Sequence, residues 1–246
     1  MILLKSLLGM TAKSILEELK PLGRESYKQL LTTNHGVKEP FFGVPVSELK
    51  KFQKRIKKDY QLALDLYDTG NYDAMYLAGL IADDARMTKK DLQRWAENAA
   101  NGGCIATATV PWVAAGSPHG KEMAMKWIDS SKIEEALAGW ATLSSLVSIT
   151  EDAELDLAEL KRLIQRVQQS IHKAPDLVRR QMNGFLISVG CYVQPLTEFA
   201  LQTGEKIGPV KADLGNNDCE IPFAPDYIRK VEKRGSIGKK RKSAKC

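Results

Sequence analysis

The side chains best suited to bind another molecule are basic, and they form two runs. The first crowds one predicted helix and consists of Lys50, Lys51, Lys54, Arg55, Lys57 and Lys58. The second is the C-terminus, where residues 229–246 contain nine Lys or Arg side chains and one Glu, a local net charge of +8. Its densest part is Lys239, Lys240, Arg241 and Lys242. Residues 1–228 carry 27 basic and 29 acidic side chains, so the overall charge of +6 belongs to the tail.

Both basic runs predict contact with nucleic-acid phosphates, because Lys and Arg neutralise phosphate charge without reading base sequence. For the helical run we favour the DNA backbone, since the rest of the body is slightly acidic. The tail run is less specific, as such runs bind DNA, RNA or acidic proteins alike. Arg179 and Arg180, at the start of another predicted helix, are further candidates for phosphate contacts, with a solvated helix face as the alternative.

The cysteines and histidines give no indication of a metal site. Cys104, Cys191, Cys219 and Cys246 lie far apart without a C-x-x-C pair, and the chain has three histidines. This pattern argues against both a zinc module and a disulfide framework. We expect no metal and no cofactor.

The elements that carry these side chains are predicted to be helices. Apolar residues recur every three or four positions over residues 157–171 and again over residues 178–189, which places them on one face of a helix. Thr88 and Asp91 have the spacing of a capping box at a helix start. Strand patterns are weak before residue 208, so the sequence predicts an all-α protein.

The helices are expected to pair. Pair starts near Thr88, Ser117 and Asp152 are 29 and 35 residues apart, close to the periods of helical repeats that stack into a solenoid. An irregular bundle is the alternative. No apolar run reaches the roughly 20 residues of a membrane span, and the N-terminus is a poor signal peptide. We therefore expect a cytoplasmic protein.

Three segments are predicted along the chain. Residues 1–207 form the single helical domain, and residues 208–233 form an irregular extension that packs on it, with a short helix over residues 226–232. Residues 234–246 consist mainly of Gly, Ser, Lys and Arg, which bury too little apolar area to fold alone. We expect this last segment to be a disordered basic tail.

Several short motifs resemble those of the bacterial DNA alkylation repair family. They are Phe42-Gly43-Val44-Pro45-Val46 before the Lys-rich helix, Ala78-Gly79-Leu80-Ile81 before Trp95, and Lys211-Ala212-Asp213-Leu214-Gly215 followed by Cys219, Pro222 and Tyr227-Ile228. The resemblance covers roughly residues 20–228. It implies an α-solenoid of HEAT-like repeats, and some members of the family are glycosylases that release N-methylated purines.

The resemblance also implies where a lesion site would lie. Active members carry a tryptophan and aspartates at a helix start that matches residues 101–110 here. The matching positions, Gly102, Gly103, Cys104, Ala106 and Thr109, include no carboxylate and no tryptophan, and the nearest acids are Glu97 and Glu122. A carboxylate stabilises the positive charge that develops on the sugar, and its loss should cost on the order of 10²–10³ in rate. No catalytic residue is assigned, and excision is in question.

Two aromatic residues are the candidates for contact with a damaged base, namely Trp112 and Phe185. Core packing is an alternative role for both, since Phe185 lies on an apolar stripe and Trp112 is most simply explained as a core residue. We expect a monomer that binds double-stranded DNA, alkylated or distorted, by shape and charge. The competing hypothesis is a non-enzymatic solenoid that binds a protein or peptide.

Overall fold

The computed structural model describes residues 10–100, 103–214 and 220–245, and all regular secondary structure in this part of the chain is helical. Its α-helices are α1 (Ala12–Leu19), α2 (Glu25–His35), α3 (Val46–Ile56), α4 (Tyr60–Asp68), α5 (Tyr72–Ile81), α6 (Lys89–Glu97), α7 (Val110–Gly116), α8 (Gly120–Trp127), α9 (Ile133–Ile149), α10 (Leu157–Ser170), α11 (Asp176–Tyr192), α12 (Thr197–Ile207) and α13 (Ala224–Lys233). Short 3₁₀ turns cover Lys20–Leu22, Asp84–Arg86, Asp152–Glu154, Ile171–Lys173 and Gln194–Leu196, and a π-helical turn covers Ile105–Thr109. The all-α prediction is confirmed.

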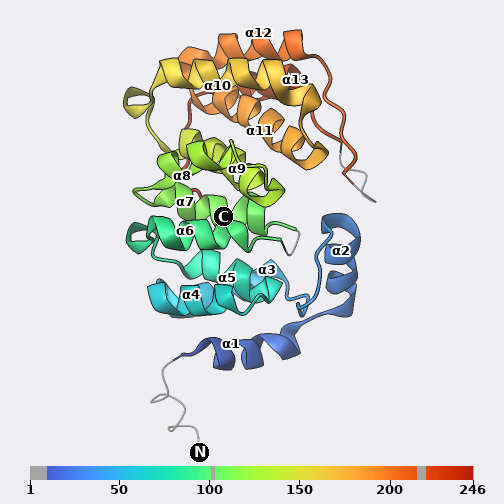
Figure 1. Cartoon of the computed structure of the whole chain (residues 1–246), viewed down its shortest axis with the longest axis vertical. Helices are drawn as coiled ribbons and strands as arrows, with labels where there is room; N and C mark the ends of the chain where they lie inside the picture. The colour runs from blue at the N-terminus through green and yellow to red at the C-terminus, as the bar shows by residue number, and fades with distance from the viewer. Residues whose placement is uncertain (1–9, 101–102, 215–219, 246) are drawn as a thin grey trace, which may run out of the picture.

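The helices stack as pairs into a solenoid. Pairs α4/α5, α6/α7, α8/α9, α10/α11 and α12/α13 follow one another along the long axis, with α1 at one end and α12 at the other (Figure 1). The second helix of each central pair packs against the next, as α9 does against both α7 and α11. This arrangement is the predicted helical-repeat solenoid rather than the irregular bundle.

Local sequence explains where the helices begin. Thr88 and Asp91 form the expected capping box at α6, and the side chains of Asn71 and Asp156 accept backbone N–H bonds at the starts of α5 and α10. Helices α5 and α9 are apolar nearly all round, because neighbours cover them on several sides. Within the described residues no single helix is long and apolar enough to cross a membrane, and α11 and α12 reach that length only together, across a bend of 115°.

The second helices run in the same direction, which gives the solenoid two distinct edges. Their first residues lie together at what we call the N-terminal edge, where the Tyr72 hydroxyl meets the Cys104 N–H and Lys132 pairs with Glu97. Their last residues lie at the opposite C-terminal edge. Because α9 has 17 residues, the two edges are about 25 Å apart.

The C-terminal segment is ordered, so the prediction of a disordered tail is wrong. Residues 236–245, which we call the strap, cross the C-terminal ends of three second helices. The Gly238 N–H donates to the Cys191 carbonyl at the end of α11, and the Arg241 N–H donates to Ser148 at the end of α9, at 2.9 and 2.8 Å. Ala244 is buried.

Two buried lysines anchor the strap. Lys240 Nζ donates to the carbonyls of Val147 and Tyr192 at 3.0 and 2.7 Å and pairs with Asp152. Lys245 Nζ donates to the Ala82 carbonyl just after α5 and pairs with Asp84. Ammonium groups stabilise the negative end of a helix. The composition of the tail suggested disorder, but its lysines have carbonyl partners that come together only in the folded solenoid. The preceding helix, expected over residues 226–232, is confirmed as α13.

Candidate nucleic-acid interface

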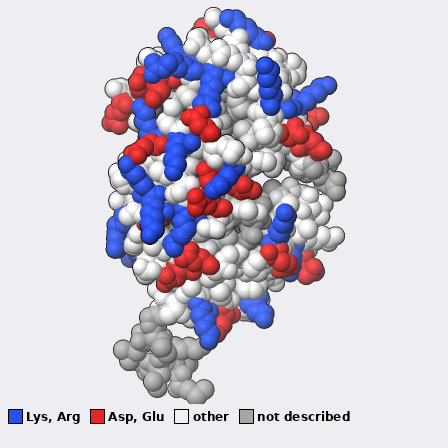
Figure 2. Space-filling view, in the orientation of Figure 1, with Lys and Arg blue, Asp and Glu red and all other residues white. Residues whose placement is uncertain are grey.

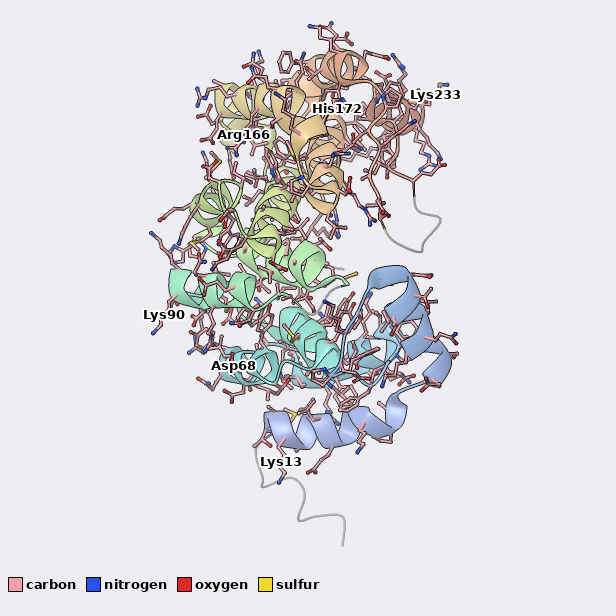
Figure 3. All side chains as sticks on the ribbon, turned by 45° about the vertical axis from the view of Figure 1, so that its right-hand side comes forward. Lys13, Asp68, Lys90, Arg166, His172 and Lys233 are labelled. Carbon is pink, nitrogen blue, oxygen red and sulfur yellow. The ribbon has the colours of Figure 1, made fainter. Side chains whose placement is uncertain are left out.

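A notch opens on one side of the molecule, between the surface over α2 and the surface over α11 and α13 (Figure 2). His172, in the loop that leads into α11, lies in the upper part of the molecule, where its ring contacts the Ile207 carbonyl at the end of α12 (Figure 3). Elsewhere on the face in Figure 2, Lys and Arg are interspersed with Asp and Glu. The notch is therefore distinguished by its shape rather than by a large field of one charge.

Gly103, in the segment that resembles the lesion site, joins this segment to the end of α2, and we call its surroundings the floor. The Gly103 N–H donates to the His35 carbonyl at the end of α2, at 2.8 Å. Gly103 has a φ of +60°, and a Cβ atom there would lie 2.7 Å from Val37 and 2.8 Å from Tyr72. Both facts require glycine at this position. Gly102, the neighbouring candidate, is outside the described residues.

Two buried tyrosines pack beneath this floor. The Cys104 N–H lies 3.4 Å from the Tyr72 hydroxyl, and the ring of Tyr72 is followed by that of Tyr76 at 6.5 Å. Tyr76 then meets the edge of Trp112 at 5.5 Å. Burial raises the pKa of Tyr72 well above its ordinary value, so its hydroxyl stays protonated. Trp112 is 7% exposed, which contradicts its prediction as a contact for a damaged base, since the indole is covered by the protein.

The Asp73 carboxylate, next to Tyr72 in the chain, is buried and fully hydrogen-bonded. Asp73 is 1% exposed and accepts the N–H groups of Phe42, Gly43 and Val44 at 2.6, 3.1 and 2.9 Å. Burial raises its pKa, and these three donors act in the opposite direction. Asp73 thus fixes the loop before α3 and presents no free oxygen to the notch. The Phe-Gly-Val motif, noted in the sequence only for its resemblance, is the partner of this residue.

The rest of the predicted lesion segment is largely covered. Ala106 and Thr109 are buried, and the Thr109 methyl fills the space beside Gly79 on α5. Cys104 is half-buried. Of the other acids, Glu97 pairs with Lys132, and Glu122 pairs with Lys89 at 2.6 Å at the opposite edge. The accessible part of the segment therefore offers a thiol, hydroxyls and backbone, and no carboxylate.

Phe185 is a core residue, so its prediction as a lesion contact is also wrong. Its ring is 0% exposed and packs on Trp140 with ring centroids 5.4 Å apart. The apolar stripe that places Phe185 on α11 turns it toward α9. The alternative of core packing was the correct one.

The start of α11 presents cations at the N-terminal edge. Arg180 is exposed, and so is Lys173 just before the helix. Arg179 is instead held by the protein, because its guanidinium donates to the carbonyls of Lys211 and Ala174 and pairs with Asp176. Helix starts carry partial positive charge that favours phosphate. Arg180 thus remains a candidate DNA contact, whereas Arg179 is mainly structural.

A cleft of about 280 Å³ separates the starts of α9 and α11 beside these cations. Its walls include Ile133, Trp140, Pro175 and Met182, and Arg166 lies at its margin. The Arg166 guanidinium is 5.7 Å from the Trp140 ring and pairs with Asp129. This cleft could not be predicted from the sequence, because its walls come from separate repeats.

The basic run on α3 does not reach the notch. Lys51, Arg55 and Lys58 pair with Glu48, Glu18 and Asp83. Asp83 follows α5, so this end of α3 is at the C-terminal edge, while Lys50 is half-buried and Lys54 is exposed. The end of the run therefore lies away from the notch, and contact of residues 50–58 with DNA phosphates stays a prediction.

The tail run is also at the C-terminal edge. Lys240 is 7% exposed and anchors the strap, so it is not a DNA contact. Lys239, Arg241 and Lys242 are exposed. In the described part of the chain, no group of three or more His, Cys, Asp or Glu is arranged to hold a metal ion.

Comparison with known proteins agrees with this architecture. The sequence profile of the DNA alkylation repair enzyme family matches residues 15–211, most of the solenoid. The chain belongs to this family. As a DNA alkylation repair family member it keeps the helical scaffold, but the segment that resembles the lesion site has no carboxylate.

Similar proteins include two uncharacterized Listeria proteins and one solved structure. Lin0241 of Listeria innocua and Lmo0209 of Listeria monocytogenes are each 27% identical over 205 residues, which is 82% of this chain and 88% of the relative. The solved structure is described as a new family of proteins related to the HEAT-like repeat DNA glycosylases with affinity for branched DNA structures. It is 34% identical, covers 96% of this chain and 100% of its own, and superposes with a TM-score of 0.87.

Proposed function

We propose that this protein binds branched or otherwise distorted double-stranded DNA in the notch and does not excise bases. The observation that carries the proposal is the floor of the notch, where Cys104 and covered tyrosines stand in place of a carboxylate. The similarity to a protein with affinity for branched DNA supports the choice of ligand. The protein acts in this proposal as a cytoplasmic monomer.

Binding in the notch rests on shape and charge. The starts of α9 and α11, with the exposed Lys173 and Arg180, face the phosphates on one wall, and α2 forms the other wall. Such contacts fix the position of a duplex but carry no base sequence. A branch point is more open and deformable than a continuous duplex, which lowers the cost of fitting it to a narrow site.

The absence of excision follows from the same floor. A methylated purine leaves readily, yet positive charge grows on the sugar as the glycosidic bond breaks, and a nearby carboxylate is what stabilises it. The Asp73 carboxylate at the start of α5 cannot take this role, because three backbone N–H groups donate to it. With hydroxyl groups alone, the rate of base excision should be about 10²–10³-fold lower than in a site that has the carboxylate.

Binding is tested with three forms of the full-length protein and two DNA ligands, a four-way junction and a linear duplex of equal length. We compare the wild type, K173E/R180E at the notch, and K13E/K20E as a control. Lys13 and Lys20 are exposed at the α1 end of the solenoid (Figures 1 and 3). The notch variant should lose at least about tenfold in affinity for both ligands, and the control should match the wild type. A wild type without salt-dependent DNA binding would refute the proposal and favour a protein- or peptide-binding solenoid.

Excision is tested by single-turnover release of methylated purines from alkylated duplex DNA. The expected result is release at the spontaneous rate, with the DNA still bound. Release well above that rate would contradict the proposal and would show that another group stabilises the sugar.

A further inference from the structure

The two basic runs that the sequence placed far apart meet at the C-terminal edge. Lys58, at the end of α3, pairs with Asp83 at 3.8 Å, and Lys245 of the strap pairs with Asp84 at 2.7 Å. Burial lowers the pKa of Lys245, and the nearby Lys58 ammonium acts in the same direction. Lys242 is three residues from Lys245, so Lys242 lies within about 11 Å of this junction along the chain.

The cations of the strap have two roles, because two of them are paired inside the protein and three are exposed. Lys240 and Lys245 point inward and neutralise Asp152 and Asp84. The side chains of Lys239, Arg241 and Lys242 stay exposed, and in the described residues none of these three has a carboxylate within ion-pair distance. We call Lys57, Lys58, Lys239, Arg241 and Lys242 the basic ridge.

The basic ridge has the properties of a surface that binds a polyanion, rather than those of an ordinary solvated helix face. Its underlying acids, Asp83, Asp84 and Asp152, are already paired with lysines. The outer cations are held on a backbone that hydrogen bonds to α9 and α11. Ordering an otherwise flexible basic segment removes much of the entropic cost of binding a rigid polyanion.

The ridge and the notch cannot both touch one straight duplex. They lie at opposite ends of the second helices, about 25 Å apart, with the solenoid between them. A branched DNA has more than one duplex arm, and its arms diverge. We infer that the basic ridge binds the backbone of a second duplex arm of the branched DNA whose branch point lies in the notch.

This inference rests on the proposed function, since it assumes branched DNA in the notch. It accounts for the basic strap and for the end of α3, neither of which the notch uses. It also gives a physical basis for preferring a branch over a linear duplex. A junction can occupy both surfaces at once, and the second contact then forms at a high effective concentration.

The test adds K239E/K242E, the ridge variant, to the wild type, K173E/R180E and K13E/K20E. All four full-length proteins are titrated with a four-way junction and with a linear duplex at several salt concentrations. For the ridge variant we expect at least about a tenfold loss of junction affinity, and a smaller dependence of that affinity on salt, by roughly one to two in the log–log slope. Its duplex affinity should stay within about twofold of the wild type.

The outcomes separate the two proposals. Loss of both affinities in the notch variant, with loss of junction affinity alone in the ridge variant, supports both. A ridge variant that binds the junction as the control does would overturn the second-arm inference and leave the notch proposal intact. A wild type that binds neither DNA overturns both. Because Lys239 and Lys242 are exposed, the ridge variant should keep the wild-type melting temperature, and a large drop would call for the neutral pair K239Q/K242Q in the same assay.

Discussion

At the scale of single residues, burial decides which polar and aromatic side chains can act. Asp73 lies next to Tyr72, which contacts the segment that resembles the lesion site, so its position alone would suggest a catalytic carboxylate. Its three N–H partners and its 1% exposure make it a structural residue instead. Phe185 and Trp112 likewise have the residue type of a base contact, but both side chains are inside the protein.

We expect Asp73→Asn to lower the free energy of unfolding by about 2–3 kcal/mol, because one amide oxygen cannot accept the three N–H groups that the carboxylate accepts. Urea denaturation measures this change. Asp65→Asn, on the exposed face of α4, is the matched control and should stay within about 0.5 kcal/mol of the wild type. An equally small effect for Asp73→Asn would show that the loop before α3 does not depend on the carboxylate.

Phe185→Leu distinguishes a core residue from a DNA contact. The smaller side chain should leave a cavity against Trp140 and cost roughly 1–3 kcal/mol of stability. DNA affinity, measured below the melting temperature, should be unchanged. A loss of affinity in a variant of nearly wild-type stability would instead place the ring in the interface.

At the scale of elements, the strap shows how a low-complexity segment becomes ordered. Helix ends leave carbonyl groups without partners inside the helix. The ends of α5, α9 and α11 bring such carbonyls together at one edge, and Lys240 and Lys245 donate to three of them. At these helix ends, lysine ammonium groups from the C-terminal strap therefore take the role that a C-terminal glycine cap usually has.

Lys245→Met should destabilise the protein by about 3–5 kcal/mol, because it leaves the Asp84 carboxylate buried without its cation. Lys245 and Asp84 have side-chain exposures of only 12% and 17%, so solvent screens the pair little. The double variant Asp84→Leu with Lys245→Met should recover most of the loss, since apolar pairs often replace buried ion pairs at little cost. Additive losses in this double-mutant cycle, measured by denaturation, would show that the two residues are not coupled.

At the scale of the whole molecule, the strap links repeats that are distant in the stack. Solenoids normally have contacts only between neighbouring repeats, and their ends can unfold separately. Here Lys245 hydrogen bonds to Ala82, 163 residues away in sequence. The strap thus connects the α4/α5 pair with the α10/α11 pair, which are not neighbours in the stack.

A chain ending at Gly235 should therefore unfold less cooperatively than the full chain. We expect a lower urea m-value, or two transitions in place of one, because the two ends of the solenoid are no longer connected. Hydrogen exchange should show faster opening of α5 and of the end of α9. A single transition with an unchanged m-value would mean that neighbour contacts alone make the solenoid cooperative.

The sequence by itself determined the helical class, the pairing of helices, the caps such as Thr88–Asp91, and the missing carboxylate in residues 101–110. Each of these depends on residues close together in the chain, through the helical period or through a motif of a few positions. Only the tertiary structure decided that Phe185 is buried, that the strap is ordered, and that the two basic runs lie on the edge opposite the notch. The physical reason is that exposure and charge pairing depend on partners from distant repeats, as Lys245 with Asp84 and Lys240 with Asp152 illustrate.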